Sequence, residues 1–191
     1  MKCSIRQVKL EGGKRGIAAL ELALILPVLM ILAFGIIDFG RLIHARLIIT
    51  NVSREGGSLA SRDINSGNDL LTMLQVSGSP LDLKGSGKIY ISQITAGATA
   101  GAPKPVSASQ IYGGSLAIGS SIGNGQSNLG LSGEIYNHLV FKPANKTSDI
   151  SGVTVVEVYY KYLPVTPLPN FIANILVGDG GGKIISSKSV F

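Results

Sequence analysis

The feature that most constrains this chain is an almost wholly apolar run of 21 residues near its start, Ile17 to Ile37. A helix rises about 1.5 Å per residue, so this run is long enough to cross the roughly 30 Å hydrocarbon core of a bilayer. A small-residue cleavage site of the secretory type does not follow it, because the next residues are Asp38, Phe39, Gly40 and Arg41. The sequence therefore predicts a retained single-pass membrane helix.

The distribution of charge predicts the orientation of that helix. The net charge of the chain is +6, but residues 1–16 carry five basic residues against Glu11, or +4, and the other 175 residues carry only +2. Basic residues beside a membrane helix mark its cytoplasmic side, so we expect residues 1–16 in the cytoplasm and the C-terminal part outside. Nucleic-acid binding needs a basic patch on a folded domain, and this distribution predicts none. The single cysteine, Cys3, allows no disulfide framework.

Glu21 is an acidic residue inside the apolar run, where an insertion cost of about 2.5–3.5 kcal/mol applies at the centre of a membrane helix. One interpretation is that Glu21 lies near the interface and its carboxylate reaches the headgroups. The other is that it has a cationic partner. Cleavage between Gly16 and Ile17 would supply one, because the new α-amino group of Ile17 is positive. Glu21 would then pair with that group on a neighbouring subunit, and so act as an assembly determinant.

This arrangement resembles the type IV prepilin signature: a basic leader ending in glycine, a cut before an apolar helix, and glutamate at the fifth mature position. The longer segment from Arg15 to Arg62, about a quarter of the chain, is similar to the TadE-like family, the pseudopilins of Tad (Flp-type) pilus systems. The similarity is carried by Arg15, Gly16, Glu21, Leu26, Pro27, Phe34, Gly35, Asp38, Gly40, Arg41, Ser53, Arg54, Glu55 and Gly56. Asp38 stands where glutamate is common, and Ser53 where alanine is common.

The resemblance implies a minor pseudopilin that takes part in assembly of a Tad-type pilus and is not an enzyme. A prepilin peptidase would process it after Gly16. The implied partners are other pilins and pseudopilins of the Tad system, the prepilin peptidase, the inner-membrane assembly platform and the lipid bilayer. The implied location is the bacterial inner membrane, with the C-terminal domain periplasmic or extracellular, or in the pilus. No cofactor, metal or nucleic acid is expected.

Several helix positions have a physical role that needs no family. Pro27 removes a backbone hydrogen bond and should kink the helix. Ala19 and Ala23 form a small-residue face that suits close helix packing. Asp38 and Arg41 are three residues apart, so they can pair at the outer membrane surface, or they mark only a stop-transfer boundary.

Apolar residues continue at near-helical spacing beyond the membrane, and they predict the surface on which a head would sit: Leu42, Leu47, Ile48, Val52 and Leu59. We expect one helix from Ile17 to about Arg62, ~69 Å long, that Gly56 and Gly57 weaken. The predicted segments are a leader (1–16), a transmembrane helix (17–37), its membrane-proximal continuation (38–62) and an extracytoplasmic β-rich domain (63–191). The fold class is α+β and pilin-like.

Within the head the pattern predicts one short helix at 69–76, another at 171–177, and a turn at 178–182. The predicted strands are 88–95, 135–141, 153–162 and 183–191, with a short strand around Gln110 inside a mostly loop segment, 97–133. The strand at 153–162 is the clearest and ends before Pro164. Its two faces carry Val156, Val158, Tyr160 and Tyr162 on one side, and Glu157 and Lys161 on the other.

The sequence offers little for catalysis. The two histidines, His44 and His138, have no partners at catalytic or zinc-binding spacing. The glycines before Lys183 do not match a phosphate loop, because Val177 and Ile184 stand at two required positions. Three alternatives remain: an uncleaved signal-anchored periplasmic binding or scaffolding protein, a secreted hydrolase, and a pseudopilin of a type II secretion machine. The first predicts indifference to Glu21→Ala, and the TadE-like resemblance argues against the last.

Overall fold

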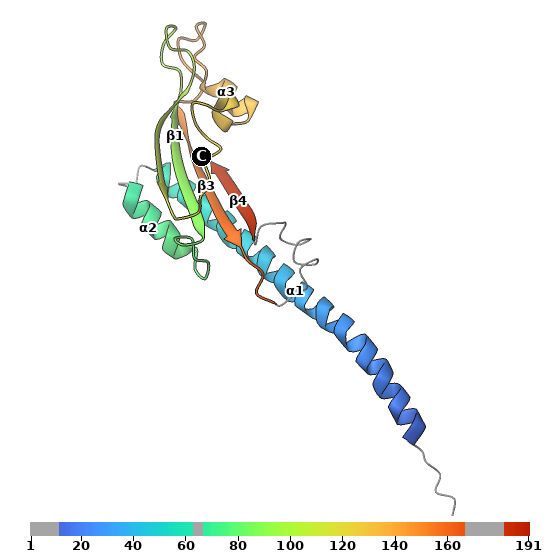
Figure 1. Ribbon diagram of the computed structural model, residues 1–191. Coiled ribbons are helices and arrows are strands. Elements are labelled where there is room, and N and C mark those ends of the chain that lie inside the picture. The colour runs from blue at the N-terminus through green and yellow to red at the C-terminus, as the bar shows by residue number, and fades with distance from the viewer. Residues whose placement is uncertain (1–11, 63–66, 167–181) are drawn as a thin grey trace, which may run out of the picture.

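The computed structural model describes residues 12–62, 67–166 and 182–191. Its dominant element is the helix α1, Gly12–Ala60, of 49 residues. Figure 1 shows the N-terminal half of α1 standing clear of everything else, while its C-terminal half lies along a small head. This long apolar helix with a small antiparallel sheet is the pilin-like α+β architecture that the sequence predicted.

Burial along α1 changes abruptly at Asp38. Every residue from Gly16 to Met30 is exposed, although nearly all are apolar. From Asp38 onward one face is buried at helical spacing, by Asp38, Ala45, Ile49, Val52, Ser53 and Gly56. Within the described residues, α1 is long and apolar enough to cross a membrane, and the mean hydropathy of its most apolar window is 2.7. It fits a single-pass membrane anchor.

The head is a four-stranded antiparallel sheet in the order β2-β1-β3-β4. The strands are β1 (Gly87–Thr95), β2 (Val106–Gly113), β3 (Gly152–Tyr162) and β4 (Lys183–Val190). The central pair, β1 and β3, is in register from Gly87 opposite Tyr160 to Thr95 opposite Gly152. The helix α2 (Gly67–Ser77) packs beside α1 and β2.

One face of the sheet packs on α1 and α2 and forms the main core. The β3 alternation predicted from the sequence is confirmed, because Val156, Val158 and Tyr162 are buried here and Tyr160 packs against them. Their partners on the helices are Ala45, Ile49, Val52, Leu70, Leu71 and Leu74. Full burial of each large aliphatic side chain contributes about 1.5–3 kcal/mol.

The opposite face is covered, within the described residues, over its middle and toward the end of the head that lies far from the free half of α1. The cover comes from a segment that contains a 3₁₀ helix η1 (Ser127–Gly130) and the helix α3 (Gly133–Leu139). It forms a second core of Ile94, Ile122, Leu129, Leu131, Leu139 and Val155. The sheet therefore lies between α1 and a mostly irregular segment.

The structure corrects two element predictions. The residues from Ile135 are not a strand but lie in α3, because Ser132 caps the helix by accepting from the backbone N–H of Ile135 at 3.4 Å. Glu134 lies in its first turn and His138 in its last, both favourable to the helix dipole. The strand around Gln110 is the full-length β2. The predicted helix at 171–177 lies outside the described residues.

Other predictions are confirmed to within a few residues. The short helix is α2, and three predicted strands are β1, β3 and β4. The long helix begins at Gly12 and ends at Ala60, rather than running from Ile17 to Arg62. One residue of its predicted head-facing stripe was wrong: Leu47 is 57% exposed and lies on the opposite side from Ala45 and Ile49.

Candidate functional site

The predicted processing and assembly residues lie on the free half of α1. Gly16, Ile17 and Glu21 are all exposed, and the Ile17 side chain is 63% exposed. A Cβ atom at Gly16 would meet nothing within 4 Å. Within the described residues, Glu21 makes no side-chain hydrogen bond or ion pair. These three positions are therefore open to contacts from outside the chain.

Three further motif residues of this helix have no packing role in the head. Pro27 lies inside α1. A Cβ atom at Gly35 or Gly40 would meet nothing within 4 Å, so no contact with the described residues requires glycine there.

Asp38 joins α1 to the head through hydrogen bonds. Its side chain is only 2% exposed. Its carboxylate accepts a hydrogen bond from the Val165 backbone N–H at 3.1 Å and another from the Thr166 hydroxyl. Its backbone carbonyl accepts from the Tyr162 hydroxyl at 2.9 Å. We call these four residues the Asp38 latch, because they tie α1 to the chain that leaves β3.

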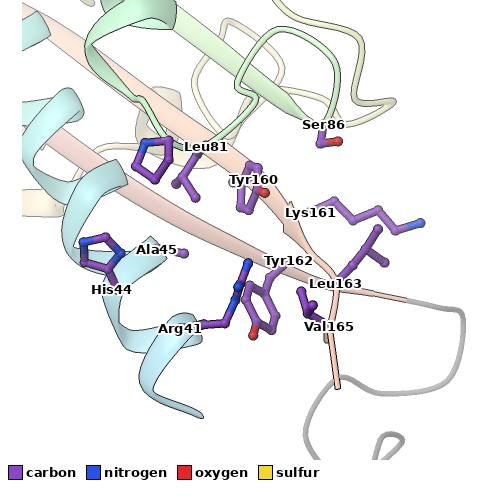
Figure 2. A pocket seen from close by; sticks show the side chains of 11 residues that line it. Arg41, His44, Ala45, Leu81, Ser86, Tyr160, Lys161, Tyr162, Leu163 and Val165 are labelled. Carbon is purple, nitrogen blue, oxygen red and sulfur yellow. The ribbon is translucent and has the colours of Figure 1, made fainter. Parts of the chain in front are cut away.

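The latch takes the place of the ion pair that was one of the two alternatives for Asp38 and Arg41. The described residues contain no salt bridge between these two side chains, because Asp38 faces the head while Arg41 lies to one side and remains exposed. Figure 2 shows Arg41 beside Tyr162. Burial, followed by the Asp38 charge, raises the pKa of Tyr162, and the nearby Arg41 guanidinium partly opposes that rise.

A pocket of about 510 Å³ opens next to the latch. It lies between α1, the segment before β1 and the end of β3 (Figure 2). The basic side chains on its lining are Arg41, His44 and Lys161, and none of the described residues on the lining carries a carboxylate. The aromatic rings of Tyr160 and Tyr162 form part of its wall.

Two further motif residues, Ser53 and Gly56, are buried against the head near the C-terminal end of α1. Ser53 is fully buried, and its hydroxyl lies 2.8 Å from that of Ser187 and 3.0 Å from that of Ser189. A Cβ atom at Gly56 would lie 2.7 Å from the Leu74 side chain. Gly56 thus permits close packing of α2 against α1, and the helix continues past it to Ala60.

Arg54 and Glu55, between these two residues, are exposed. This half of the motif therefore combines an inward pair, which seats β4 and α2, with an outward charged pair.

Sequence reasoning missed the environment of Glu157, which is only 1% exposed. Its carboxylate accepts hydrogen bonds from the Ser120 and Ser121 hydroxyls, from the Ser121 N–H at 3.2 Å and from the Tyr159 hydroxyl at 2.9 Å. Burial, followed by the charge of Glu157, raises the pKa of Tyr159 to about 12. The only signal in the sequence was a charge in the middle of an apolar strand.

The two histidines lie in different parts of the molecule. His44 lies on α1 and lines the pocket. His138 lies in the last turn of α3, and its Nδ1 atom is 2.7 Å from the Asp149 carboxylate. The side chains of Lys142 and His138 both contact the Asp149 carboxylate. The hydrogen bond from Lys142, followed by the one from His138, lowers the pKa of the Asp149 carboxyl. Across the part of the chain that the structure describes, no group of three His, Cys, Asp or Glu side chains could hold a metal ion.

Comparison with known proteins agrees with the resemblance read from the sequence. No curated protein and no solved structure matches the chain. The matching family model covers 43 of the 191 residues of the chain. Residues 16–58, which include the free half of α1, the latch residue Asp38 and the Gly56 contact, match the family model described as TadE-like protein.

Proposed function

We propose that this chain is a TadE-like minor pseudopilin that a prepilin peptidase cleaves after Gly16, and that Glu21 then directs its assembly into a Tad-type pilus. The observation that carries the proposal is the division of α1 at Asp38. Fifteen consecutive residues, Gly16 to Met30, are exposed and almost all apolar, while the head covers only the second half. Apolar surface of this extent needs lipid or neighbouring helices around it.

Among lipid and neighbouring helices, Glu21 would act as an assembly determinant. A carboxylate in lipid is costly, and an opposite charge offsets much of that cost. After cleavage the Ile17 amine lies four residues away on the same helix, about 6 Å along its axis. A neighbouring subunit displaced by about one turn would bring its own amine to Glu21. The pair would form only between subunits in register.

A second feature supports packing against neighbouring helices outside the membrane. An apolar stripe continues past the latch on the side of α1 away from the sheet. Beyond Asp38 its members are Phe39 (54% exposed), Ile43 (46%) and Leu47 (57%), and they continue the line of Ile36 (72%), which belongs to the apolar run before the latch. Their spacing of three and four residues places them on one helix face. An isolated anchored head would expose polar residues there, whereas a subunit packed against other helices would cover this stripe.

The proposed partners follow from this arrangement. They are the other pilins and pseudopilins of a Tad system, the prepilin peptidase and the inner-membrane assembly platform. The proposed topology has residues 1–16 in the cytoplasm, α1 through the inner membrane and the head in the periplasm or on the pilus. The alternative is an uncleaved, signal-anchored periplasmic binding or scaffolding protein.

The test of Glu21 is Glu21→Gln in cells that carry the cognate pilus system. We expect the variant to be processed and inserted normally, while its co-purification with other pseudopilins falls at least tenfold, because an ion pair in lipid is lost. Glu55→Gln is the matched control, since Glu55 is an exposed acid on the head-bearing half of α1. Equal co-purification of Glu21→Gln and Glu55→Gln would favour the signal-anchor alternative.

A further inference from the structure

The pocket beside the Asp38 latch lies at a defined height relative to a membrane. Arg41, on its lining, follows Ile37, the last residue of the apolar run, by four residues, or about 6 Å along the helix. The headgroup layer adds roughly 5–7 Å to each side of the hydrocarbon core. If Ile17 to Ile37 spans the core, the pocket therefore opens at the level of the lipid phosphates.

The end of the head that faces the free half of α1 is basic. β3 points toward that half in Figure 1, so the end of β3 and the start of β4 lie nearest the membrane. Basic residues lie there on α1, in the loop before β1 and at the ends of β3 and β4: Arg41, Lys84, Lys161 and Lys183. The acidic residues placed there by the structure are Asp38, buried in the latch, and Asp82, whose carboxylate accepts the Gly85 N–H at 2.8 Å.

We propose that this pocket binds the phosphodiester headgroup of an anionic phospholipid in the leaflet that faces the head. Arg41 supplies the planar donor group that suits a phosphate, and Lys161 supplies a second positive charge. Leu163 and Val165, 51% and 62% exposed at the rim, suit the glycerol and upper acyl carbons. A free phosphate would leave these apolar side chains in water, and a zwitterionic headgroup would bring a second cation to a basic pocket.

Bound lipid would set the height and tilt of the head against the membrane while the subunit waits for assembly. The inference rests on the membrane placement of α1 and does not depend on cleavage or on Glu21.

The experiment is native mass spectrometry of the full chain in detergent micelles, titrated with phosphatidylglycerol, phosphatidylcholine or inorganic phosphate. We expect phosphatidylglycerol to bind more tightly than phosphatidylcholine, and its binding to weaken as salt is raised. Arg41→Gln and Lys161→Gln should each weaken it about fivefold, the usual effect of one basic residue near an anionic surface. Arg46→Gln, a loss of the same charge five residues further along α1 and outside the pocket, should leave it unchanged.

Three results would overturn the proposal. One is equal binding of the two lipids, another is an equal effect of Arg41→Gln and Arg46→Gln, and the third is tighter binding of inorganic phosphate than of phosphatidylglycerol. Flotation of the same chain with phosphatidylcholine vesicles reports insertion of α1 separately. A chain that inserts but shows no preference for phosphatidylglycerol contradicts the pocket alone, whereas a chain that fails to float contradicts the membrane placement.

Discussion

At the scale of single residues, Asp38 is the buried charged side chain of the joint between helix and head. A buried carboxylate needs hydrogen-bond donors, and the latch provides two of them from the chain just after β3. The joint lies at the boundary between the exposed and the buried parts of α1. Asp38 therefore stabilises the head against the helix at the level where a membrane surface would begin.

Asp38→Ala should destabilise the head by about 1–3 kcal/mol, because it leaves the Val165 N–H and the Thr166 hydroxyl without their acceptor. Urea unfolding of the full chain in detergent, followed by circular dichroism, measures the change. Asp38→Asn keeps one acceptor oxygen and should lose less. If Asp38→Ala unfolds at the same urea concentration as the wild type, the latch contributes nothing to stability.

Tyr159 gives the head a dependence on alkaline pH. Its pKa in the folded chain is about 12, above the ordinary value of 10.0. The unfolded chain therefore loses this proton more readily, so the associated stability is complete below about pH 10 and is lost as the pH rises through 12. Burial also raises the pKa values of Tyr90, Tyr160 and Tyr162, which act in the same direction.

Tyr159→Phe should reduce the fall in stability between pH 10 and 12, because the phenol that titrates is gone. Unfolding free energies measured at intervals of half a pH unit give the slope. Tyr112→Phe, at a side chain that is 62% exposed, is the control. An identical slope for Tyr159→Phe and the wild type would show that Tyr159 does not titrate differently in the two states.

At the scale of elements, the two faces of α1 have different tasks. The face with Ala45, Ile49 and Val52 is fully buried against the sheet. The opposite face keeps Phe39, Ile43 and Leu47 exposed. Period alone cannot distinguish these stripes, because both are apolar and both recur every three or four residues. This is why Leu47 was assigned to the wrong face and why Ala45 and Ile49 were not recognised from the sequence.

The double change Ile43→Ser with Leu47→Ser should leave the stability of the head within about 0.5 kcal/mol of the wild type, as exposed substitutions usually do. It should nevertheless reduce co-purification with other pilus subunits if neighbouring helices cover this face. Ile49→Ser, on the buried face, should cost about 2–5 kcal/mol. Urea unfolding and affinity capture separate the two effects, and a large loss of head stability in the double variant would contradict the assigned faces.

Elements with a strong local pattern were predictable, and those fixed by tertiary contacts were not. β3 alternates apolar and polar residues, and α1 is apolar over several turns, so both followed from the sequence. α3 was mistaken for a strand because Ile135 and Tyr136 have high β propensity, whereas the Ser132 cap and the contacts of Leu139 determine a helix. The burial of Glu157 depends on Ser120 and Ser121, which lie more than thirty residues away in the chain.

At the scale of the whole molecule, the chain is a helix of ~74 Å with its head at one end (Figure 1). The candidate functional residues lie partly on the free half of α1 and partly where α1 meets the head. Glycine, charge and spacing around Gly16 and Glu21 could be read directly from the sequence, since they lie within one helix. The latch and the pocket join α1 to residues about 120 positions later, and no local pattern links such distant segments.

The proposed function as a pseudopilin depends on whether the chain is processed. The most direct measurement is the N-terminal sequence of the protein recovered from membranes of cells that also express the cognate prepilin peptidase. The account predicts a chain that begins at Ile17, with the Gly16–Ile17 bond cleaved. A chain that still begins at Met1, while the same peptidase cleaves another substrate in those cells, would contradict the pseudopilin assignment and leave Glu21 without its proposed partner.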